Sequence, residues 1–401
     1  MAAECPTSWG GQPMRGAIDR AAPRRRRSPS SATTSLPPAA STNVSNNTNY
    51  FVYKAGAAAC GAGQPPSLSR LPACDIPMKE RDCDCDHEYH VSHHTDCDTE
   101  REFRQGNTGI LQLRGWSSSS LPPLVAQLQP SFDAPFDTAE LCVLCPGSQN
   151  WELKTEVPIV HGGEGEERRH DLERWTVTNV TVPIGGRYLC WANYDLATFL
   201  VCDMVDAIDN DSPKLHYVPL PVKAMPSLRN DFDEDDYHEK QPRWHYNRTI
   251  GAGAGADTVW FVSMDNRCCC GVTVTTSLCA HSSSAFTVTM WSLDLRTNSQ
   301  MAWVKEAVID CEEIWALLAA SCKGFPRSVQ VISPIVSLEN PDVVCFVAYH
   351  DLQDTNIRDV WEMWTLEIDM RRKTLISVVP YPPHPNRWLH HSIHLPAKLH
   401  S

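Results

Sequence analysis

Cysteine, histidine and aspartate are concentrated in residues 82–98, whose sequence is DCDCDHEYHVSHHTDCD. Zinc takes four nitrogen or sulfur ligands in a tetrahedron, and this stretch could supply them from one loop. The candidate ligands are Cys83, Cys85, His90, His94 and Cys97. However, one residue separates the first two cysteines where two to four are usual, no second cysteine pair follows, and the five aspartates favour a solvated loop. We therefore favour a surface loop over a zinc site, and we predict no metal and no cofactor.

Other chemical patterns in the chain are also incomplete. Cys142 and Cys145 form CVLC on a β-type run, away from the helix N-terminus that would activate a thiol, so we interpret them as strand or core cysteines. We interpret Cys268–Cys270 in the same way. The acidic stretch containing Asp231, Asp233 and Asp235 lacks the glycine and the glutamate of a calcium loop. The repeat GAGAGA at 251–256 lacks the lysine of a phosphate loop, which indicates a flexible connection.

No residue is predicted to be catalytic. The chain has no GxSxG motif, and no set of cysteine, histidine and aspartate has a spacing that singles it out. The histidines His390, His391 and His394 lie in a polar C-terminal segment, where nothing positions them beside a nucleophile.

Composition restricts the partners and the compartment. The formal charge of −13 and the pI near 5.6 argue against nucleic acid as a partner, and no apolar run is long enough to span a membrane. The basic run Arg24–Arg27 and the absence of an apolar signal segment argue against secretion. We expect the nucleus or the cytoplasm, with this run as an import patch, and an organelle transit peptide stays open as the alternative.

Short β-type runs dominate from Tyr50 onward and predict an all-β fold of β-propeller-like architecture. They are rich in valine, threonine and aromatic residues, and turn residues separate them; examples are YFVYKA, GILQL, RWTVTNVTV, RYLCWANY, TVWFVSM, AFTVTMWSLDL, DVVCFVAYH and TLISVVPY. One helix is predicted near 311–323, because Asp310 can cap it and Glu313 completes a capping box.

An internal similarity supports a repeated design. Residues 286–304 and 360–378 share an apolar run, a tryptophan, alternating apolar and acidic residues, a polar turn and a second strand. Each segment is expected to form a hairpin, although the period of roughly 40 to 50 residues typical of propeller blades is not kept. The tryptophans are interpreted as core anchors.

The order of these segments resembles the plant family called domain of unknown function 1618, which is expanded in grasses. The matching segments include FVYKA, PSLSRLPAC, LVAQLQ, WELKTEVPI, RYLCWANYDLATFLVCDMV, LHYVPLP, RCCCG, PIVSLENPDVVCFVAY and IDMRRKTLISVVPY. The resemblance implies no established enzymatic activity and a distant similarity to the propeller-like regions that follow F-boxes in plant ubiquitin-ligase adaptors.

The predicted organisation follows from composition and resemblance together. We expect a disordered tail at 1–48, the first part of the β domain at 49–150 with a polar insertion at 76–106, the main family domain at 151–385, and a polar tail at 386–401. The favoured function is a non-enzymatic protein-interaction module with an unidentified protein partner. The alternative is a hydrolase or small-ligand-binding propeller with a site in the central funnel. The loops around Asp195 and at Asn340–Asp342 are the candidate binding surface.

Overall fold

The computed structural model of the 401-residue chain describes residues 18–20, 49–54, 66–77, 101–104, 106–114, 122–131, 136–161, 172, 175, 177–209, 212–222, 247–253, 257–266, 285–296, 301–321, 325, 329–351 and 361–380. The chain divides into two compact units, residues 1–105 and 106–401. Most of the predicted tails at 1–48 and 386–401 and of the insertion at 76–106 lies outside the described residues.

The first unit contains a three-stranded antiparallel sheet. Its strands are β1 (Ile18–Arg20), β2 (Tyr50–Lys54) and β3 (Ser67–Arg70), in that order. β1 is the part of the predicted tail that the structure describes, and it pairs with β2. Phe103 packs edge-on against Tyr50, with ring centroids 5.1 Å apart, and its main-chain N–H donates to the Tyr50 hydroxyl.

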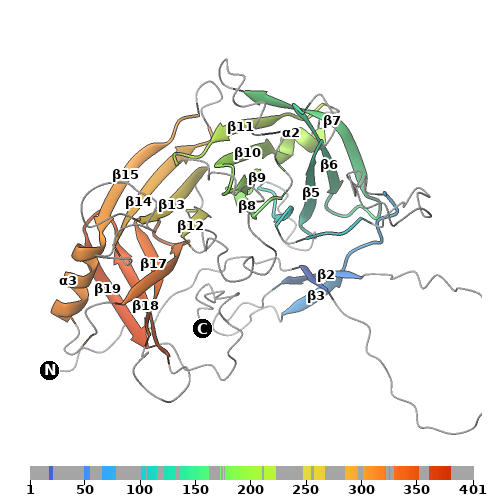
Figure 1. The fold of residues 1–401 in the computed structure, drawn as a ribbon. Helices are drawn as coiled ribbons and strands as arrows, with labels where there is room; N and C mark the ends of the chain where they lie inside the picture. The colour runs from blue at the N-terminus through green and yellow to red at the C-terminus, as the bar shows by residue number, and fades with distance from the viewer. Residues whose placement is uncertain are drawn as a thin grey trace, which may run out of the picture. The chain divides into compact units, whose positions relative to one another are not determined.

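The second unit is formed by the strands β4 to β19 and two described helices (Figure 1). In chain order, the elements are β4 (Thr108–Leu111), β5 (Leu124–Pro130), β6 (Thr138–Leu144), β7 (Glu152–His161), β8 (Val180–Ile184), β9 (Tyr188–Asn193), β10 (Thr198–Asp203), α2 (Met204–Asp209), β11 (Leu215–Pro219), β12 (Arg248–Ala252), β13 (Thr258–Asn266), β14 (Phe286–Asp294), β15 (Val304–Asp310), α3 (Cys311–Ser321), β16 (Gln330–Val336), β17 (Val343–Asp351), β18 (Trp361–Asp369) and β19 (Thr374–Pro380).

These strands form four consecutive antiparallel groups of four. The groups β4–β7 and β8–β11 are joined into one eight-stranded sheet by the parallel pairing of β7 with β11, in which Ile159 lies opposite Leu215. The groups β12–β15 and β16–β19 are separate sheets, and Figure 1 shows them next to each other with α3 on their outer side. The hairpin predicted at 360–378 is found as β18–β19. In the segment 286–304 the first strand is β14, but its partner β15 begins only at Val304, so this hairpin extends beyond the predicted segment.

Three apolar clusters lie between successive groups and explain why the strands are apolar on both faces. In β9, Leu189 and Trp191 belong to the cluster shared with the first group, whereas Tyr188 and Cys190 belong to the cluster shared with the third. In β13, the odd-numbered apolar residues belong to the cluster between the second and third groups. The even-numbered ones belong to the third cluster, which the third group shares with β16–β19 and α3. Because successive strand residues point to opposite faces, a strand between two clusters must be apolar throughout.

The first strands of successive groups lie beside one another. The hydroxyl of Thr181 on β8 donates to the main-chain oxygen of Gly106, just before β4, at 2.6 Å. Between these strands, a Cβ placed on Gly109 would lie 2.7 Å from side-chain atoms of both Leu189 and Thr181. Likewise, a Cβ on Gly251 of β12 would lie 3.0 Å from Val336 of β16. The four-stranded groups thus pack side by side with their first strands adjacent, which confirms the prediction of an all-β, propeller-like fold.

Several local predictions need correction. Residues Gly251 and Ala252, predicted to belong to a flexible connection, pair with Trp260 and Val259 as part of β12, because glycine permits the close approach of Val336. The strand predicted within RWTVTNVTV begins only at Val180. Helix α2 was not predicted, and it begins after Asp203, whose carboxylate accepts the main-chain N–H groups of residues 205 and 206.

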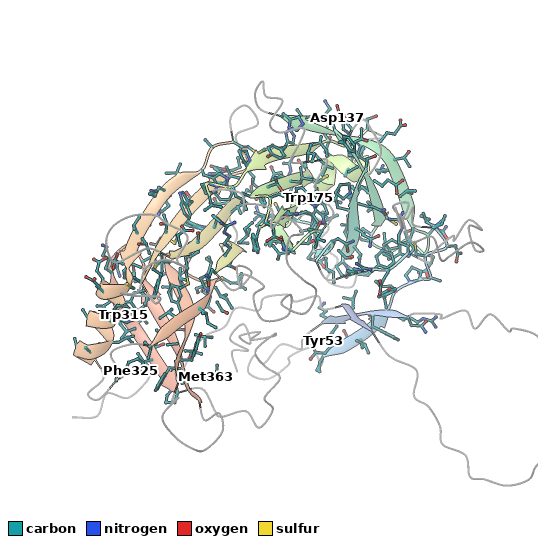
Figure 2. The ribbon with its side chains drawn as sticks, in the orientation of Figure 1. Tyr53, Asp137, Trp175, Trp315, Phe325 and Met363 are labelled. Atoms are coloured by element: carbon teal, nitrogen blue, oxygen red, sulfur yellow. The ribbon has the colours of Figure 1, made fainter. Side chains whose placement is uncertain are left out.

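The predicted helix near 311–323 is confirmed over Cys311–Ser321, and its capping box is formed. Asp310 Oδ1 accepts the main-chain N–H of Glu312 at 3.1 Å, and Glu313 Oε2 accepts that of Asp310 at 2.9 Å. Figure 2 marks Trp315 on α3. Its ring packs against Phe286, and its Nε1 donates to the main-chain oxygen of Val329 at 3.3 Å. The helix thus covers the outer end of the third cluster.

Substitution of Asp310 by alanine is expected to lower the free energy of unfolding by about 1 kcal/mol, because an N-terminal N–H of α3 loses its acceptor. Chemical denaturation monitored by circular dichroism measures this change. The variant Asp310→Asn, which keeps a side-chain oxygen able to accept this N–H, provides the matched control and is expected to change stability by less than about 0.5 kcal/mol. Equal effects of the two substitutions would contradict a capping role.

No helix among the described segments is both long enough and apolar enough to cross a membrane.

Candidate functional site

The connections at one end of the strand groups gather on a common surface. In each antiparallel group, the connection between the first and second strands and that between the third and fourth lie at the same end. Arg114, after β4, donates its main-chain N–H to Gly186 in the β8–β9 turn at 2.8 Å. Leu295, after β14, donates to the main-chain oxygen of Asp257, before β13, at 2.9 Å. Arg114 also forms an ion pair with Asp257, so the connections of three groups meet here.

Charged side chains from these connections form what we call the charged rim, which consists of Arg114, Arg187, Asp203, Asp257, Asp294 and Arg296. Each arginine has a carboxylate neighbour. Arg187 Nε donates to Asp203 Oδ2 at 2.7 Å, Arg296 Nη2 donates to Asp294 Oδ2 at 2.7 Å, and Arg114 Nη1 lies 3.7 Å from Asp257 Oδ1. The guanidinium of Arg187 also lies over the ring of Tyr188, 5.5 Å from its centroid.

The arginines of the charged rim face solvent while their partners are more enclosed. The exposed fractions of the Arg114, Arg187 and Arg296 side chains are 55%, 52% and 68%. In contrast, the Asp257 side chain is 19% exposed, and its Oδ1 atom is buried without a hydrogen-bond partner in the described structure. The guanidinium group is planar with several donors in a fixed fork, which suits carboxylates on a partner.

The pair Asp294–Arg296 makes a measurable prediction. Asp294 accepts hydrogen bonds from Nε and the main-chain N–H of Arg296, both at 3.0 Å, in addition to the bond from Nη2. These bonds lower the pKa of Asp294 to about 2. Since an unfolded aspartate has a pKa of about 3.9, the stability that this pair contributes is complete above that pH and is lost as the pH falls through about 2.

Carbon-13 NMR titration of the side-chain carboxyl groups is expected to show Asp294 titrating at about 2. The variant Arg296→Ala is expected to raise the pKa of Asp294 towards the ordinary value of about 3.9. An Asp294 that already titrates at the ordinary value in the unmodified protein would show that this pair is not formed in solution.

The predicted loop at Asn340–Asp342 lies at the corresponding end of the fourth group. Arg371, in the β18–β19 turn, forms ion pairs at 2.8 Å with Asp342 and with Glu306 of β15. The Arg371 guanidinium also lies 6.0 Å from the ring centroid of Trp260 on β13. We call the arrangement of Arg371, Asp342 and Glu306 the Arg371 bridge. The loop therefore connects two sheets through a charged contact.

The predicted loop around Asp195 lies at the opposite end of its strands, in the β9–β10 connection. Asn193 Oδ1 accepts the main-chain N–H groups of Asp195 and Leu196, both at 2.9 Å. The buried Arg248 donates to the main-chain oxygen of Tyr194, and burial lowers the pKa of this arginine. Thus the two predicted loops do not form one surface, and this turn is fixed by internal hydrogen bonds.

The remaining sequence candidates have separate outcomes. The zinc candidates Cys83, Cys85, His90, His94 and Cys97 lie outside the described residues, as do the acidic residues of the calcium interpretation, Cys268–Cys270 and the C-terminal histidines. Cys142 is buried on β6, as predicted, and Cys145 follows that strand with its pKa raised by burial. Among the described residues, no group of three or more histidine, cysteine, aspartate or glutamate side chains could hold a metal ion.

The charged rim was missed because its residues are far apart in the sequence. Arg114, Arg187 and Asp257 come from three strand groups, and only the stacking of those groups brings them together. The local signal was limited to the spacing of Asp294 and Arg296, in which an aspartate at a strand end is followed two residues later by an arginine. Such a turn motif is common and does not indicate a shared surface.

Comparison with known sequences gives a match to one family model. The search of curated proteins found no match. The region that matches the family model begins within β9 and ends within β17. It therefore includes Asp257, Arg296 and the loop at Asn340–Asp342, whereas Arg114 and Arg187 precede it. Within this chain, residues 191–345 match the family described as "Protein of unknown function (DUF1618)", which confirms over this region the resemblance inferred from the sequence.

Proposed function

We propose that this chain is a non-enzymatic protein-interaction module that presents the charged rim to a protein partner. The observation that carries the proposal is the convergence of three solvent-facing arginines from three successive strand groups. Arginine is enriched at protein interfaces, and its exposed donors pair with carboxylates of a partner. A rigid scaffold of stacked sheets holds these turns in place, as in other proteins that bind through loops.

The free energy expected from the arginine–aspartate pairs of the charged rim differs between folding and binding. Exposed ion pairs usually contribute between 0 and about 1 kcal/mol to stability. Because the side chains of Arg187 and Arg296 are more than half exposed, we expect them to add little to folding and expect their removal to leave the scaffold intact. At an interface, by contrast, an arginine that becomes desolvated can account for about 2 kcal/mol or more of the binding free energy.

We further propose that the protein is a plant protein that works in the nucleus or the cytoplasm, with Arg24–Arg27 as the import signal. This part of the proposal rests on the family match and on the basic run in the sequence. Fluorescence microscopy of the tagged chain, compared with a variant in which the four arginines are replaced by alanine, tests it. Loss of nuclear signal in the variant is the expected result.

Quantitative affinity capture from plant extract tests the interaction role. The baits are the full chain, the double variant Arg187→Ala/Arg296→Ala and the matched control Arg70→Ala/Lys214→Ala, which removes the same charge from exposed positions outside the rim. Proteins enriched by the full chain and the control but lost with the rim variant are the expected result. Identical enrichment by all three baits would contradict a role for the rim.

A further inference from the structure

Among the described residues, the strand β19 has a neighbouring strand on one side only, which leaves its other edge open to pairing. It pairs with β18 and is the terminal strand in the order β16-β17-β18-β19. Its sequence, TLISVVP, contains no charged residue. Ile376 and Val379 are each 53% exposed, so apolar side chains border this edge. An open edge presents main-chain N–H and C=O groups to which another strand can add.

Comparison with β15 shows what is unusual about β19. The two strands hold the same place, as the second strand of the two similar hairpins and the terminal strand of their sheets. β15 carries Lys305, Glu306 and Asp310, charged residues of the kind that protect sheet edges from pairing. β19 has a terminal proline, Pro380, and a register shift at Ile376, which lies opposite no residue of β18. The edge of β19 is therefore the one suited to accept a strand.

Charge at the start of β19 indicates which segment fits. The preceding turn contains Arg371, Arg372 and Lys373. Arg371 is engaged in the Arg371 bridge, and Lys373 Nζ donates to Glu313 at 2.8 Å. Arg372 is 82% exposed, and its Nε lies 3.8 Å from Asp369, a carboxylate that already accepts the main-chain N–H of Arg372. Its guanidinium therefore faces solvent beside the open edge and complements a carboxylate.

We propose that the free edge of β19 binds an extended segment of a partner protein by antiparallel strand addition. Main-chain hydrogen bonds hold such a segment beside β19, and its apolar side chains pack against the exposed Ile376 and Val379. In the antiparallel direction, the C-terminal end of the segment lies beside the β18–β19 turn. The partner segment is therefore an apolar β-type run followed by acidic residues that pair with Arg372.

This inference rests on the proposed function in one respect, that the partner is a protein, but it uses a different surface from the charged rim. The two can fail separately. The variant Arg187→Ala/Arg296→Ala is expected to bind a peptide at the β19 edge as the unmodified chain does. A variant with a substitution on β19 is expected to retain the partner that the charged rim captures.

The test uses a fluorescein-labelled synthetic peptide in which valine and threonine alternate and glutamates follow at the C-terminal end. A second peptide has the glutamates at the N-terminal end, and a third has lysines in their place. Fluorescence anisotropy with the full chain measures affinity, and hydrogen exchange of the β19 amides locates the bound peptide. We expect binding of the first peptide with protection of β19, and weaker binding of the other two.

Two variants and one control identify the contacts. Arg372→Glu is expected to weaken binding of the first peptide about tenfold and to favour the lysine peptide, because the charge complementarity is reversed. Val379→Lys is expected to abolish binding, whereas Val308→Lys on β15 is the matched control and is expected to bind as the unmodified chain does. Circular dichroism confirms that each variant folds.

Three results would overturn the proposal. The first is absence of binding by the first peptide, and the second is binding without regard to peptide direction or to Arg372. The third is protection of the β19 amides that rises with protein concentration in the absence of peptide, which would assign the edge to a second copy of this chain.

Discussion

Replacing Gly106 with alanine is expected to destabilise the second unit strongly. A Cβ at this position would lie 2.3 Å from the main-chain oxygen of Thr178, a distance that requires the backbone to move. The same glycine accepts the hydroxyl of Thr181, so a backbone shift also breaks a contact between the first strands of two groups. We expect the free energy of unfolding to fall by roughly 2 to 4 kcal/mol, which urea denaturation measures.

A second glycine provides the control for this prediction. At Gly251, the nearest atom to an added Cβ is the Val336 Cβ at 3.0 Å, which a small movement of the neighbouring strand relieves. The variant Gly251→Ala is therefore expected to lose less stability than Gly106→Ala. Unchanged unfolding of Gly106→Ala would contradict the close approach of the segments before β4 and β8.

Replacing Trp191 with alanine is expected to cost about 3 to 5 kcal/mol of unfolding free energy, the usual range for a fully buried tryptophan. Trp191 on β9 is fully buried in the cluster between the first two groups. Its Nε1 donates to the main-chain oxygen of Asn107 at 2.9 Å, so it also ties β9 to the segment before β4. Denaturation followed by circular dichroism measures the loss.

The variant Trp191→Phe separates the two contributions of this side chain. Phenylalanine keeps much of the apolar contact but removes the donor to Asn107, whose oxygen still accepts the main-chain N–H of Leu128 at 3.1 Å. We expect a loss of about 1 to 2 kcal/mol, smaller than that of the alanine variant. As a control, Val177→Ala at an exposed position is expected to change stability by less than about 0.5 kcal/mol. A Trp191→Ala variant as stable as this control would contradict the packing of the first two groups.

The fold class could be predicted because the strong signals are local. Strands such as β14 and β17 are apolar runs bounded by turn residues, and α3 begins at a capping box whose residues are three apart. Helix α2 was missed because it has six residues and follows the apolar strand β10 without a break, so its sequence carries too little helical periodicity.

The period of the repeat could not be predicted because the connections vary in length. The first strands of the groups begin at Thr108, Val180, Arg248 and Gln330, much farther apart than the roughly 40 to 50 residues of a compact blade. Long segments between strands therefore hide the repetition, and only the two hairpins of the third and fourth groups remained recognisable.

The candidate site depends on contacts that no local pattern encodes. Asp257 and Arg114 meet because two groups stack, and the Arg371 bridge joins Asp342 to Glu306 across two sheets. In these places the sequence specifies the strands, and the stacking of the strands specifies the surface. The sequence named Asn340–Asp342 as a candidate binding loop, and binding there stays a prediction; the structure adds that Asp342 of this loop contacts Arg371. The sequence could not identify the arginines that face solvent.

The most direct test of the central claim is the affinity of a purified captured partner for three forms of the full chain, measured by isothermal titration calorimetry. The forms are the unmodified chain, Arg187→Ala/Arg296→Ala and the control Arg70→Ala/Lys214→Ala. If the charged rim binds the partner, Kd rises at least about tenfold for the rim variant, which corresponds to about 1.4 kcal/mol, and stays unchanged for the control. Equal Kd values for all three forms would contradict the claim that the charged rim is the binding surface.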